Sequence, residues 1–312
     1  FSRIPLAKGV IVDGAVMEPE ALTATIKELY QQSGCKSKKI VTSISGHAVI
    51  VKKATFAQMD GEELRALIRD EAGKYLPFDD MAAVDYDFQI IGENPYNPSQ
   101  MEVLIVAAKK EIIEGYTGAI HAAGLIPVIM DVDSFALETM YEENYEFTEN
   151  DVTILINIGA SITNLNAVKG AMSIFTRDFT LGGNSVTEAL AANLGVSFEE
   201  AEKAKIEGTG DGEQARAAYR EGLIAYADPI CSEIERSVEY FRSTFGAENI
   251  GKVLLSGGGC MITGMAADLG SRLGIETEIV NPFRKISFDK KVLEPGAAER
   301  IGPIAAVGVG LA

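Results

Sequence analysis

Two apolar strands that run directly into glycine-rich loops constrain this chain more than any other feature of its sequence. The first is the run at residues 152–158, followed by the small residues 159–161, and the second is the run at 252–255, followed by the glycines 257–259. Small residues let backbone N–H groups approach phosphate oxygens closely, and α/β sheets bind ligands beyond the carboxyl ends of their strands. The pattern therefore favours an α/β fold with a ligand-binding sheet edge.

Strand-like and helix-like segments alternate along the rest of the chain, which is typical of α/β proteins whose sheets are covered by helices. Residues 47–126 form a separate unit of β, α, β, β, α type. Strands are predicted at 39–44, 48–56, 84–91, 101–107, 127–130, 152–158, 163–168, 171–179, 252–255 and 276–280. Helices are predicted at 20–32, 60–76, 111–123, 134–141, 185–194, 213–245, 262–273 and 304–311. A further helix is predicted to begin after a capping box formed by Ser197 and Glu200.

Composition excludes several classes of protein. The chain has 312 residues, 47% of them hydrophobic and 23% charged, which is the mix of a soluble globular protein with a sizeable core. The net charge is −17 and Lys and Arg are scattered, so nucleic acid is a poor partner. Acidity of this size mainly indicates solubility, although it would also attract a basic peptide. The apolar runs fall short of the roughly 20 residues that span a bilayer, and the first residues lack the features of a signal peptide. Three widely spaced cysteines indicate a reducing compartment, so we expect a cytoplasmic protein.

The loop after residue 156 is the first candidate site. The residues of this loop are small or polar, and a second strand follows directly after it. The backbone N–H groups of the loop can therefore converge on a phosphate. The candidate residues are Asn157, Gly159, Ala160, Ser161, Thr163 and Asn164. An ordinary β-hairpin with small turn residues would give the same local pattern.

A second group of candidates follows along the chain. It comprises Gly182, Gly183, Asn184, Glu202, Lys205, Gly257, Gly258, Gly259 and Met261. The glycine run allows a flat base or ribose to lie against the backbone, although a tight turn is the simpler alternative. Glu202 and Lys205 share one helical face, where they could contact a ribose or form a solvated ion pair.

The order of these elements resembles that of the actin-like ATPases, in which two glycine loops clasp a nucleotide from opposite sides of a cleft. Within that superfamily the chain most resembles the PilM family of type IV pilus proteins, relatives of the division protein FtsA. The resemblance covers essentially the whole chain. It is carried by residues 11–17 (IVDGAVM), 41–47 (VTSISGH), 101–110 (MEVLIVAAKK), 131–138 (DVDSFALE), 175–178 (FTRD) and 281–283 (NPF).

The resemblance implies an actin-like fold, a duplicated ribonuclease H-like α/β architecture, with an FtsA-type subdomain called 1C. Residues 1–46 and 127–149 would form subdomain 1A, residues 47–126 would form 1C, and residues 150–312 would form the second actin-like half, with subdomains 2A and 2B and a closing helix that returns to 1A. It also implies ATP or ADP with Mg²⁺ in the cleft, bound by the candidates named above.

The function that the resemblance implies is that of a cytoplasmic scaffold in pilus biogenesis and twitching motility. Such a protein binds the amino-terminal cytoplasmic peptide of PilN in a groove between 1A and 1C, and so is recruited to the cytoplasmic face of the inner membrane. Through PilN it is linked indirectly to PilO, PilC and the assembly and retraction motors. An extended peptide can pair with a strand edge while its side chains fill pockets.

The chain departs from the superfamily pattern in two respects. Actin-like ATPases carry a first phosphate loop, of the type Asp-x-Gly-Ser-Ser, ahead of everything present here, so we expect weak ATP binding. In the second loop, Asn157, Ser161 and Asn164 replace the usual Asp, Gly and Asp. Asn157 would hold Mg²⁺ through water less firmly than a carboxylate, so slow turnover at most is expected. Asp131 and Asp133 are candidates to replace that carboxylate or, as we favour, to cap the next helix.

Two other functions fit the same fold class. A small-molecule phosphotransferase would need a base and a substrate pocket over the γ-phosphate, which the amides at Asn157 and Asn164 disfavour. An FtsA-like polymerising protein is the second. No zinc site is predicted, because His47 and His121 lack metal-ligand spacing with a cysteine, and no nucleophile-elbow pattern supports acyl transfer.

Overall fold

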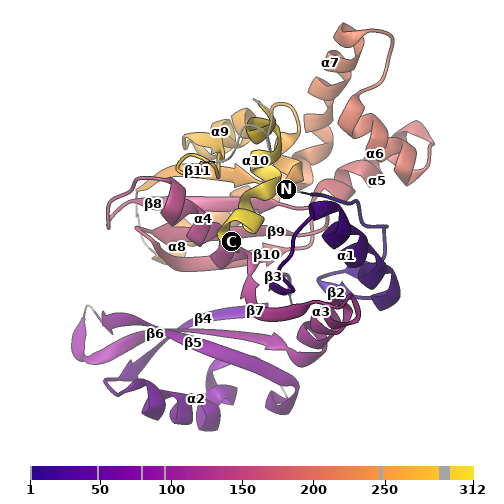
Figure 1. The fold of residues 1–312 in the computed structure, drawn as a ribbon. Coiled ribbons are helices and arrows are strands. Elements are labelled where there is room, and N and C mark those ends of the chain that lie inside the picture. Colours follow the sequence, from indigo (N-terminus) through magenta and orange to yellow (C-terminus); the bar gives the residue numbers. More distant parts are fainter. Residues whose placement is uncertain (1, 48, 79, 95, 246–248, 288–295) are drawn as a thin grey trace. The chain divides into compact units, whose positions relative to one another are not determined.

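The computed structural model of this chain describes residues 2–47, 49–78, 80–94, 96–245, 249–287 and 296–312. The chain divides into two compact units, unit 1 (Phe1–Met130) and unit 2 (Asp131–Ala312). Each unit combines helices with β-sheet (Figure 1), which confirms the α/β class predicted from the sequence. None of the helices within the described ranges combines the length and the apolar character needed to cross a membrane.

Unit 1 contains a β1–β2 hairpin, a β3–β7 pair and a three-stranded sheet of order β4-β6-β5. Its strands are β1 (Ile11–Val12), β2 (Ala15–Val16), β3 (Lys39–Ile44), β4 (Val49–Ala57), β5 (Val84–Asn94), β6 (Asn97–Lys109) and β7 (Ile126–Val132), whose last two residues belong to unit 2. Its helices are α1 (Pro19–Ser33), α2 (Gly61–Tyr75), the 3-10 turn η1 (Met81–Ala83) and α3 (Lys110–Ala122). As predicted, Pro19 opens α1 and Gly34, with φ 66°, follows its end. The strand predicted at 48–56 corresponds to β4, although residue 48 itself lies outside the described residues.

The three-stranded sheet of unit 1 is covered on one face. Along its central strand β6, Val103 and Ile105 are fully buried against Leu64 and Ile68 of α2, whereas the alternate residues are only half-buried. Because side chains alternate across a strand, those alternate residues form the opposite face. We call this the outer face; Val51, Leu104 and Val106 form its apolar centre.

Unit 2 is built on one mixed sheet of order β10-β9-β8-β11-β12, in which β10, β9 and β8 are antiparallel and β8, β11 and β12 are parallel. Its strands are β8 (Val152–Ile158), β9 (Thr163–Lys169), β10 (Met172–Phe179), β11 (Ile250–Ser256) and β12 (Thr277–Ile279). Its helices are α4 (Asp133–Asn144), α5 (Gly183–Leu194), α6 (Phe198–Glu207), α7 (Glu213–Gly222), α8 (Asp228–Phe245), α9 (Met265–Leu273) and α10 (Ala297–Gly310), with 3-10 turns η2 (Leu223–Ala227) and η3 (Gly258–Met261).

The sheet of unit 2 is covered on both faces. Ile154 and Ile156 of β8 pack with residues of α8 and α9 in one cluster, and Leu155 packs with residues of α4 and α10 in another. The two clusters explain why the apolar run in β8 is continuous, since neither face of the strand meets water. This buried frame holds the carboxyl ends of β8 and β11 in register, with Asn157 opposite Ser256.

The predicted helix boundaries are wrong at three places in unit 2. The single helix expected at residues 213–245 is divided into α7, η2 and α8; Gly222 is the last residue of α7, and Pro229 lies in the first turn of α8. Glycine weakens a helix, and proline is accommodated in a first turn but not in an interior, so α8 starts beside Pro229. The helix predicted from residue 262 begins at Met265, after Gly264 with φ 88°, and the closing helix begins at Ala297, ahead of the expected residue 304.

Candidate nucleotide-binding site

The predicted phosphate loop lies between two neighbouring antiparallel strands. β8 ends at Ile158, β9 begins at Thr163, and the Gly159 N–H donates to the Ile162 carbonyl over 2.9 Å to close the turn. A Cβ on Gly159 would lie 2.7 Å from that same carbonyl oxygen, so no larger residue fits. The loop is therefore tight and fixed by the strand pair.

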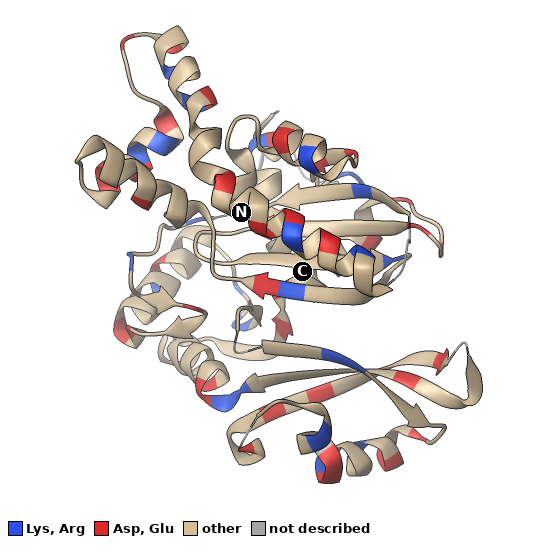
Figure 2. Cartoon of the chain, turned by 180° about the vertical axis from the view of Figure 1, so that it is seen from behind, with Lys and Arg blue, Asp and Glu red and all other residues tan. Residues whose placement is uncertain are grey.

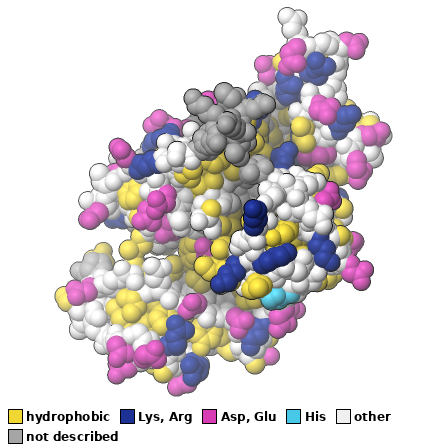
Figure 3. Space-filling model, in the orientation of Figure 1, with side chains coloured by type: hydrophobic (Ala, Val, Ile, Leu, Met, Phe, Trp, Pro, Cys, Tyr) yellow, Lys and Arg dark blue, Asp and Glu magenta, His cyan; other side chains and the backbone are white. Residues whose placement is uncertain are grey.

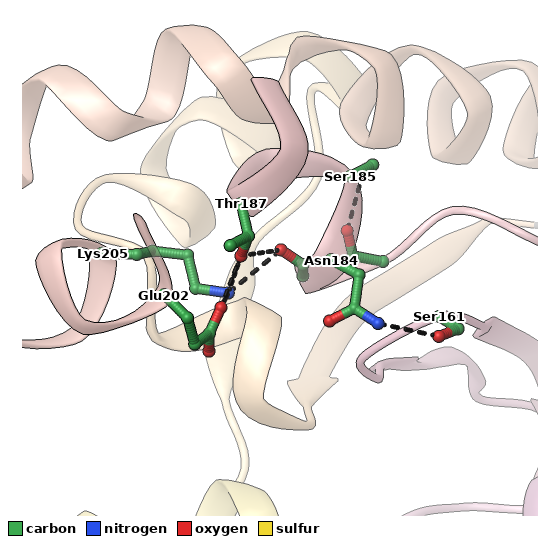
Figure 4. Close-up of polar contacts among 8 residues, drawn as sticks. Ser161, Asn184, Ser185, Thr187, Glu202 and Lys205 are labelled. Atoms are coloured by element: carbon green, nitrogen blue, oxygen red, sulfur yellow. Dashed lines mark hydrogen bonds and ion pairs between the residues drawn. The ribbon is translucent and has the colours of Figure 1, made fainter. Parts of the chain in front are cut away.

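The predicted Gly182–Asn184 segment is hydrogen-bonded to this loop at the start of α5. Gly183 N–H donates to the Gly159 carbonyl over 2.9 Å and Asn184 N–H to the Ala160 carbonyl over 2.7 Å. Asn184 Nδ2 also donates to Ser161 Oγ over 3.0 Å (Figure 4). A Cβ on Gly182 would stand 2.6 Å from the Gly159 oxygen, so the close approach requires glycine. These two segments, which the sequence predicted to share a site, are therefore in direct contact.

Glu202 and Lys205 of α6 form a bonded cluster with α5, not a solvated ion pair. Lys205 Nζ lies 2.6 Å from Glu202 Oε2, and it donates to the Gly183 carbonyl over 3.0 Å and to Thr187 Oγ1 over 2.8 Å (Figure 4). Its side chain is only 12% exposed. Since an ammonium has three hydrogens, these bonds use all of them, and Lys205 joins α6 to the first turn of α5.

Thr187 is the residue of this cluster that the sequence analysis missed. Its Oγ1 lies 2.5 Å from Glu202 Oε2 and 3.0 Å from the Gly183 carbonyl oxygen. A hydroxyl four residues after Gly183, on a helix that begins there, was the available signal, because residues i and i+4 lie on one helical face.

The three glycines after β11 have different roles. A Cβ on Gly257 would lie 2.3 Å from the Ile158 oxygen, and one on Gly259 would lie 2.2 Å from the Ile158 Cγ2. Both are therefore required by packing against the end of β8. A Cβ on Gly258, in contrast, would have no atom within 4 Å, and Met261 is 47% exposed. Gly258 and Met261 are the members of this run that are free to contact a ligand.

The amides that replace the usual carboxylates of the loop bind each other. Asn157 Nδ2 donates to Asn164 Oδ1 over 3.1 Å, across the β8–β9 pair. Ser256 Oγ of the neighbouring strand β11 lies 3.4 Å from Asn157 Oδ1. Asn164 is 1% exposed, and its Nδ2 is buried without a hydrogen-bond partner. A buried donor without an acceptor is costly, and turning both amides would let Asn164 Nδ2 donate to Asn157 Oδ1 and Asn157 Nδ2 to Ser256 Oγ, which itself donates to the Ile156 carbonyl over 3.2 Å.

The predicted capping role of Asp131 is wrong. The N-terminus of α4, at Val132, has no side-chain cap, and Asp131 Oδ1 accepts from the Val132 N–H over 2.7 Å. Burial raises the pKa of Asp131 above its usual range, with a smaller contribution from the charge of Asp133. Within the described residues no group of three or more His, Cys, Asp or Glu side chains could hold a metal ion.

Comparisons with known proteins agree with this geometry. A family model described as "Type IV pilus assembly protein PilM" matches residues 1–312. The solved structure of a "PilM-PilN type IV pilus biogenesis complex" is 30% identical, with a TM-score of 0.85 over 99% of this chain and 88% of that chain.

More distant solved structures share the fold. The ethanolamine utilization protein EutJ from Carboxydothermus hydrogenoformans is 15% identical, with a TM-score of 0.57 over 97% of this chain and 76% of that chain. MreB5 of Spiroplasma citri bound to ADP is 11% identical, with a TM-score of 0.51 over 96% of this chain and 76% of that chain. These likenesses confirm the predicted actin-like fold, and the family match extends over the whole sequence. The chain belongs to the PilM family of type IV pilus assembly proteins.

Proposed function

We propose that this chain is a cytoplasmic, nucleotide-binding scaffold of the type IV pilus machine, and that it binds the amino-terminal cytoplasmic peptide of PilN. The observation that carries the proposal is the similarity, over 99% of the chain, to a protein solved in complex with PilN. Binding of PilN would recruit the chain to the inner membrane face and link it to PilO, PilC and the motors. The subdomain boundaries at residues 47–126 and 127–149 stay predictions.

The outer face of the three-stranded sheet is the surface that we propose for the peptide. One end of this face is covered, because Val49 and Ala108 pack with Ile44 and Ile112 in a small core cluster. Beyond that cluster the face continues with the half-buried apolar side chains of Val51, Leu104 and Val106. Figure 3 shows hydrophobic side chains at the surface of unit 1. Among the described strands, β4 and β5 are the edges of the sheet, each paired only with β6. Such a face and edge suit an extended peptide.

Charge supports a basic peptide as the partner. Acidic and basic residues are interleaved over the described parts of both units (Figure 2), and the whole chain carries a net charge of −17. A surplus of negative charge accelerates the encounter with a positively charged peptide.

The peptide proposal is tested by titrating the synthetic amino-terminal segment of the cognate PilN into the chain. Val106→Asp places a charge at the centre of the outer face and is expected to weaken binding by at least about tenfold, since a buried carboxylate without a partner is costly. Met172→Asp, at a 40% exposed position on β10 of unit 2, is the matched control and should leave the affinity unchanged. Equal binding by both variants would exclude the outer face.

The nucleotide proposal rests on the two glycine loops at the ends of β8 and β11. Gly258→Val fills the open space beside the backbone without an internal clash, so it should abolish ATP and ADP binding while the melting temperature stays the same. Gly222→Val, at the end of α7, is the control, because Gly222 also has open space around it. Unchanged nucleotide affinity in Gly258→Val would remove the glycine run from the site.

A further inference from the structure

We propose that Thr187 is a positioning residue of the nucleotide-binding site. Together with Lys205 it holds the carboxylate of Glu202 so that one oxygen, Oε1, accepts a hydrogen bond from a sugar hydroxyl of the nucleotide. This role rests on the proposed nucleotide-binding function, and it decides how well the site distinguishes a ribonucleotide from a nucleotide that lacks sugar hydroxyls.

The ammonium group of Lys205 is fully used inside the protein. Its Nζ lies 2.6 Å from Glu202 Oε2, 2.8 Å from Thr187 Oγ1 and 3.0 Å from the Gly183 carbonyl oxygen. An ammonium carries three hydrogens, so these three acceptors leave none for a ligand. Lys205 therefore serves to join α6 to α5.

Thr187 lies at the centre of this cluster and is fully buried. Its Oγ1 accepts from Lys205 and lies 2.5 Å from Glu202 Oε2 and 3.0 Å from the Gly183 carbonyl oxygen. Hydrogen bonds to a carboxylate are shorter and stronger than those to a carbonyl, so the hydroxyl hydrogen goes to Glu202. The cluster contains no amide side chain or imidazole, so the direction of its bonds does not depend on how such a group is turned.

The two carboxylate oxygens of Glu202 are used unequally. Lys205 and Thr187 both contact Oε2. Figure 4 shows one oxygen of Glu202 turned toward these two residues and the other pointing away from them. Because the side chain is 35% exposed, a ligand can reach it. Within the described part of the chain Oε1 has no hydrogen-bond partner, so this oxygen is the acceptor that the cluster presents to a hydroxyl.

The cluster is joined to the candidate phosphate loop through a single residue. Gly183 accepts from Lys205 at its carbonyl and donates its N–H to the Gly159 carbonyl over 2.9 Å. A sugar hydroxyl is only a few bonds from the phosphates of a nucleotide, so a hydroxyl acceptor beside the loop suits this ligand. Glu200, another carboxylate of α6, does not compete for this role, because it caps its own helix through Ser197.

The test compares the dissociation constants of ATP and of dideoxy-ATP, which lacks both sugar hydroxyls, at fixed Mg²⁺ concentration and ionic strength. The unmodified chain should bind ATP at least about tenfold more tightly, which corresponds to one hydrogen bond to a charged group. Thr187→Val keeps the shape of the side chain but removes the hydroxyl. Glu202 then loses one of its two anchors, and the ratio of the two dissociation constants should fall to about threefold or less. Thr187→Ser returns the hydroxyl and should restore the ratio.

Thr117→Val is the matched control. It removes a hydroxyl that donates to the Ile113 carbonyl over 2.8 Å on α3 of unit 1, and it should keep the ratio of the unmodified chain. If Thr187 only supported helix packing, Thr187→Val would lower the melting temperature and weaken both nucleotides equally. An unchanged ratio in that variant would therefore overturn the positioning role.

The unmodified chain separates this role from the function on which it rests. If it binds ATP and dideoxy-ATP equally well, the role assigned to Glu202 and Thr187 is wrong and nucleotide binding stands. If neither nucleotide binds, both the nucleotide function and this role fail, whereas peptide binding is decided by its own titration. These two results do not depend on whether Thr187→Val folds.

Discussion

The central strands of the two sheets differ in how they meet water. In β8 of unit 2 nearly every residue is buried, because helices cover both faces of the sheet. In β6 of unit 1 buried and half-buried residues alternate, because α2 covers only one face. The difference separates two tasks: a doubly covered sheet fixes the ends of its strands, where the glycine loops lie, while a singly covered sheet keeps one face available to a partner.

The largest expected effect on stability comes from replacing a leucine by alanine in the central strand of the doubly covered sheet, compared with the same replacement in the central strand of the other sheet. Leu155→Ala in β8 removes a 1% exposed side chain from the cluster with α4 and α10, and should lower the free energy of unfolding by about 2–5 kcal/mol. Leu104→Ala on the outer face of β6 should cost less than about 1.5 kcal/mol, since the side chain is only half-buried and leaves no enclosed cavity. Urea denaturation measures both. Similar losses would mean that the outer face is covered in solution.

Helices α10 and α4 pack together over one face of the unit 2 sheet. Substitutions in this contact should give the next largest effect on stability. A Cβ on Gly310 would lie 1.7 Å from the Ala136 oxygen, whereas Gly308, on the same helix, has open space. Gly310→Ala should therefore destabilise the chain by about 1–3 kcal/mol through overpacking. Gly308→Ala should stabilise it by up to about 1 kcal/mol, because alanine favours a helix. Thermal unfolding of the two variants should shift in opposite directions, and shifts of the same sign would contradict this account of the covered face.

The same comparison explains which parts of the fold could be predicted from the sequence. The continuous run of β8 and the alternation of β6 are local patterns, and so are the Pro19 start and the Gly34 end of α1. The division of residues 213–245 was missed because the apolar positions keep a helical period across Gly222 and Pro229. Periodicity reports which face is buried, not whether the backbone hydrogen bonds continue.

For the site, the sequence identified the segments but not their connections. Asn157 and Asn164 were recognised as departures from a carboxylate pattern, yet their mutual hydrogen bond depends on the register of β8 and β9. Two of the three glycines after β11 are required by contacts with Ile158, which no local pattern reveals. Contacts between segments distant in sequence therefore decide whether a glycine or an amide serves packing or a ligand.

Removing a helix cap should have a smaller effect on stability, and one cap in each unit allows the two units to be compared. In unit 1, Asp60 Oδ1 accepts from the Glu62 and Glu63 N–H groups at the start of α2, and in unit 2, Ser197 and Glu200 form a capping box on α6. Asp60→Ala and Ser197→Ala should each cost about 1 kcal/mol. Hydrogen exchange should show the loss in the first turn of the affected helix only. Faster exchange at α5 in Ser197→Ala would additionally show that α6 supports the Lys205 cluster, and faster exchange throughout both units would contradict a local cap.

The smallest expected effect at any one pH involves a carboxyl group under the covered face. Glu138 of α4 contacts Ser173 Oγ of β10, which also lies 2.9 Å from Asn166 Oδ1. Asn166 Nδ2 donates to the Ser134 carbonyl over 2.9 Å, which fixes Oδ1 as an acceptor. The Ser173 hydroxyl has one hydrogen, which it donates to the Glu138 carboxyl or shares with Asn166 Oδ1.

Burial is the main cause that raises the pKa of Glu138, and the charge of Glu142 raises it further, against the lowering effect of the hydrogen bonds from Ser173 and Asn166. With a folded pKa above the unfolded one, the contribution of Glu138 to stability is complete at low pH. It is lost as the pH rises from the ordinary glutamate range through the raised value, because the unfolded chain then releases the proton first. Glu138→Gln keeps an acceptor for Ser173 and does not titrate. The difference in unfolding free energy between the unmodified chain and Glu138→Gln should therefore move in favour of the variant as the pH rises. A difference that is constant with pH in urea titrations would show that Glu138 has the same pKa in the folded and the unfolded chain, and that this side of the sheet is wetter than its burial indicates.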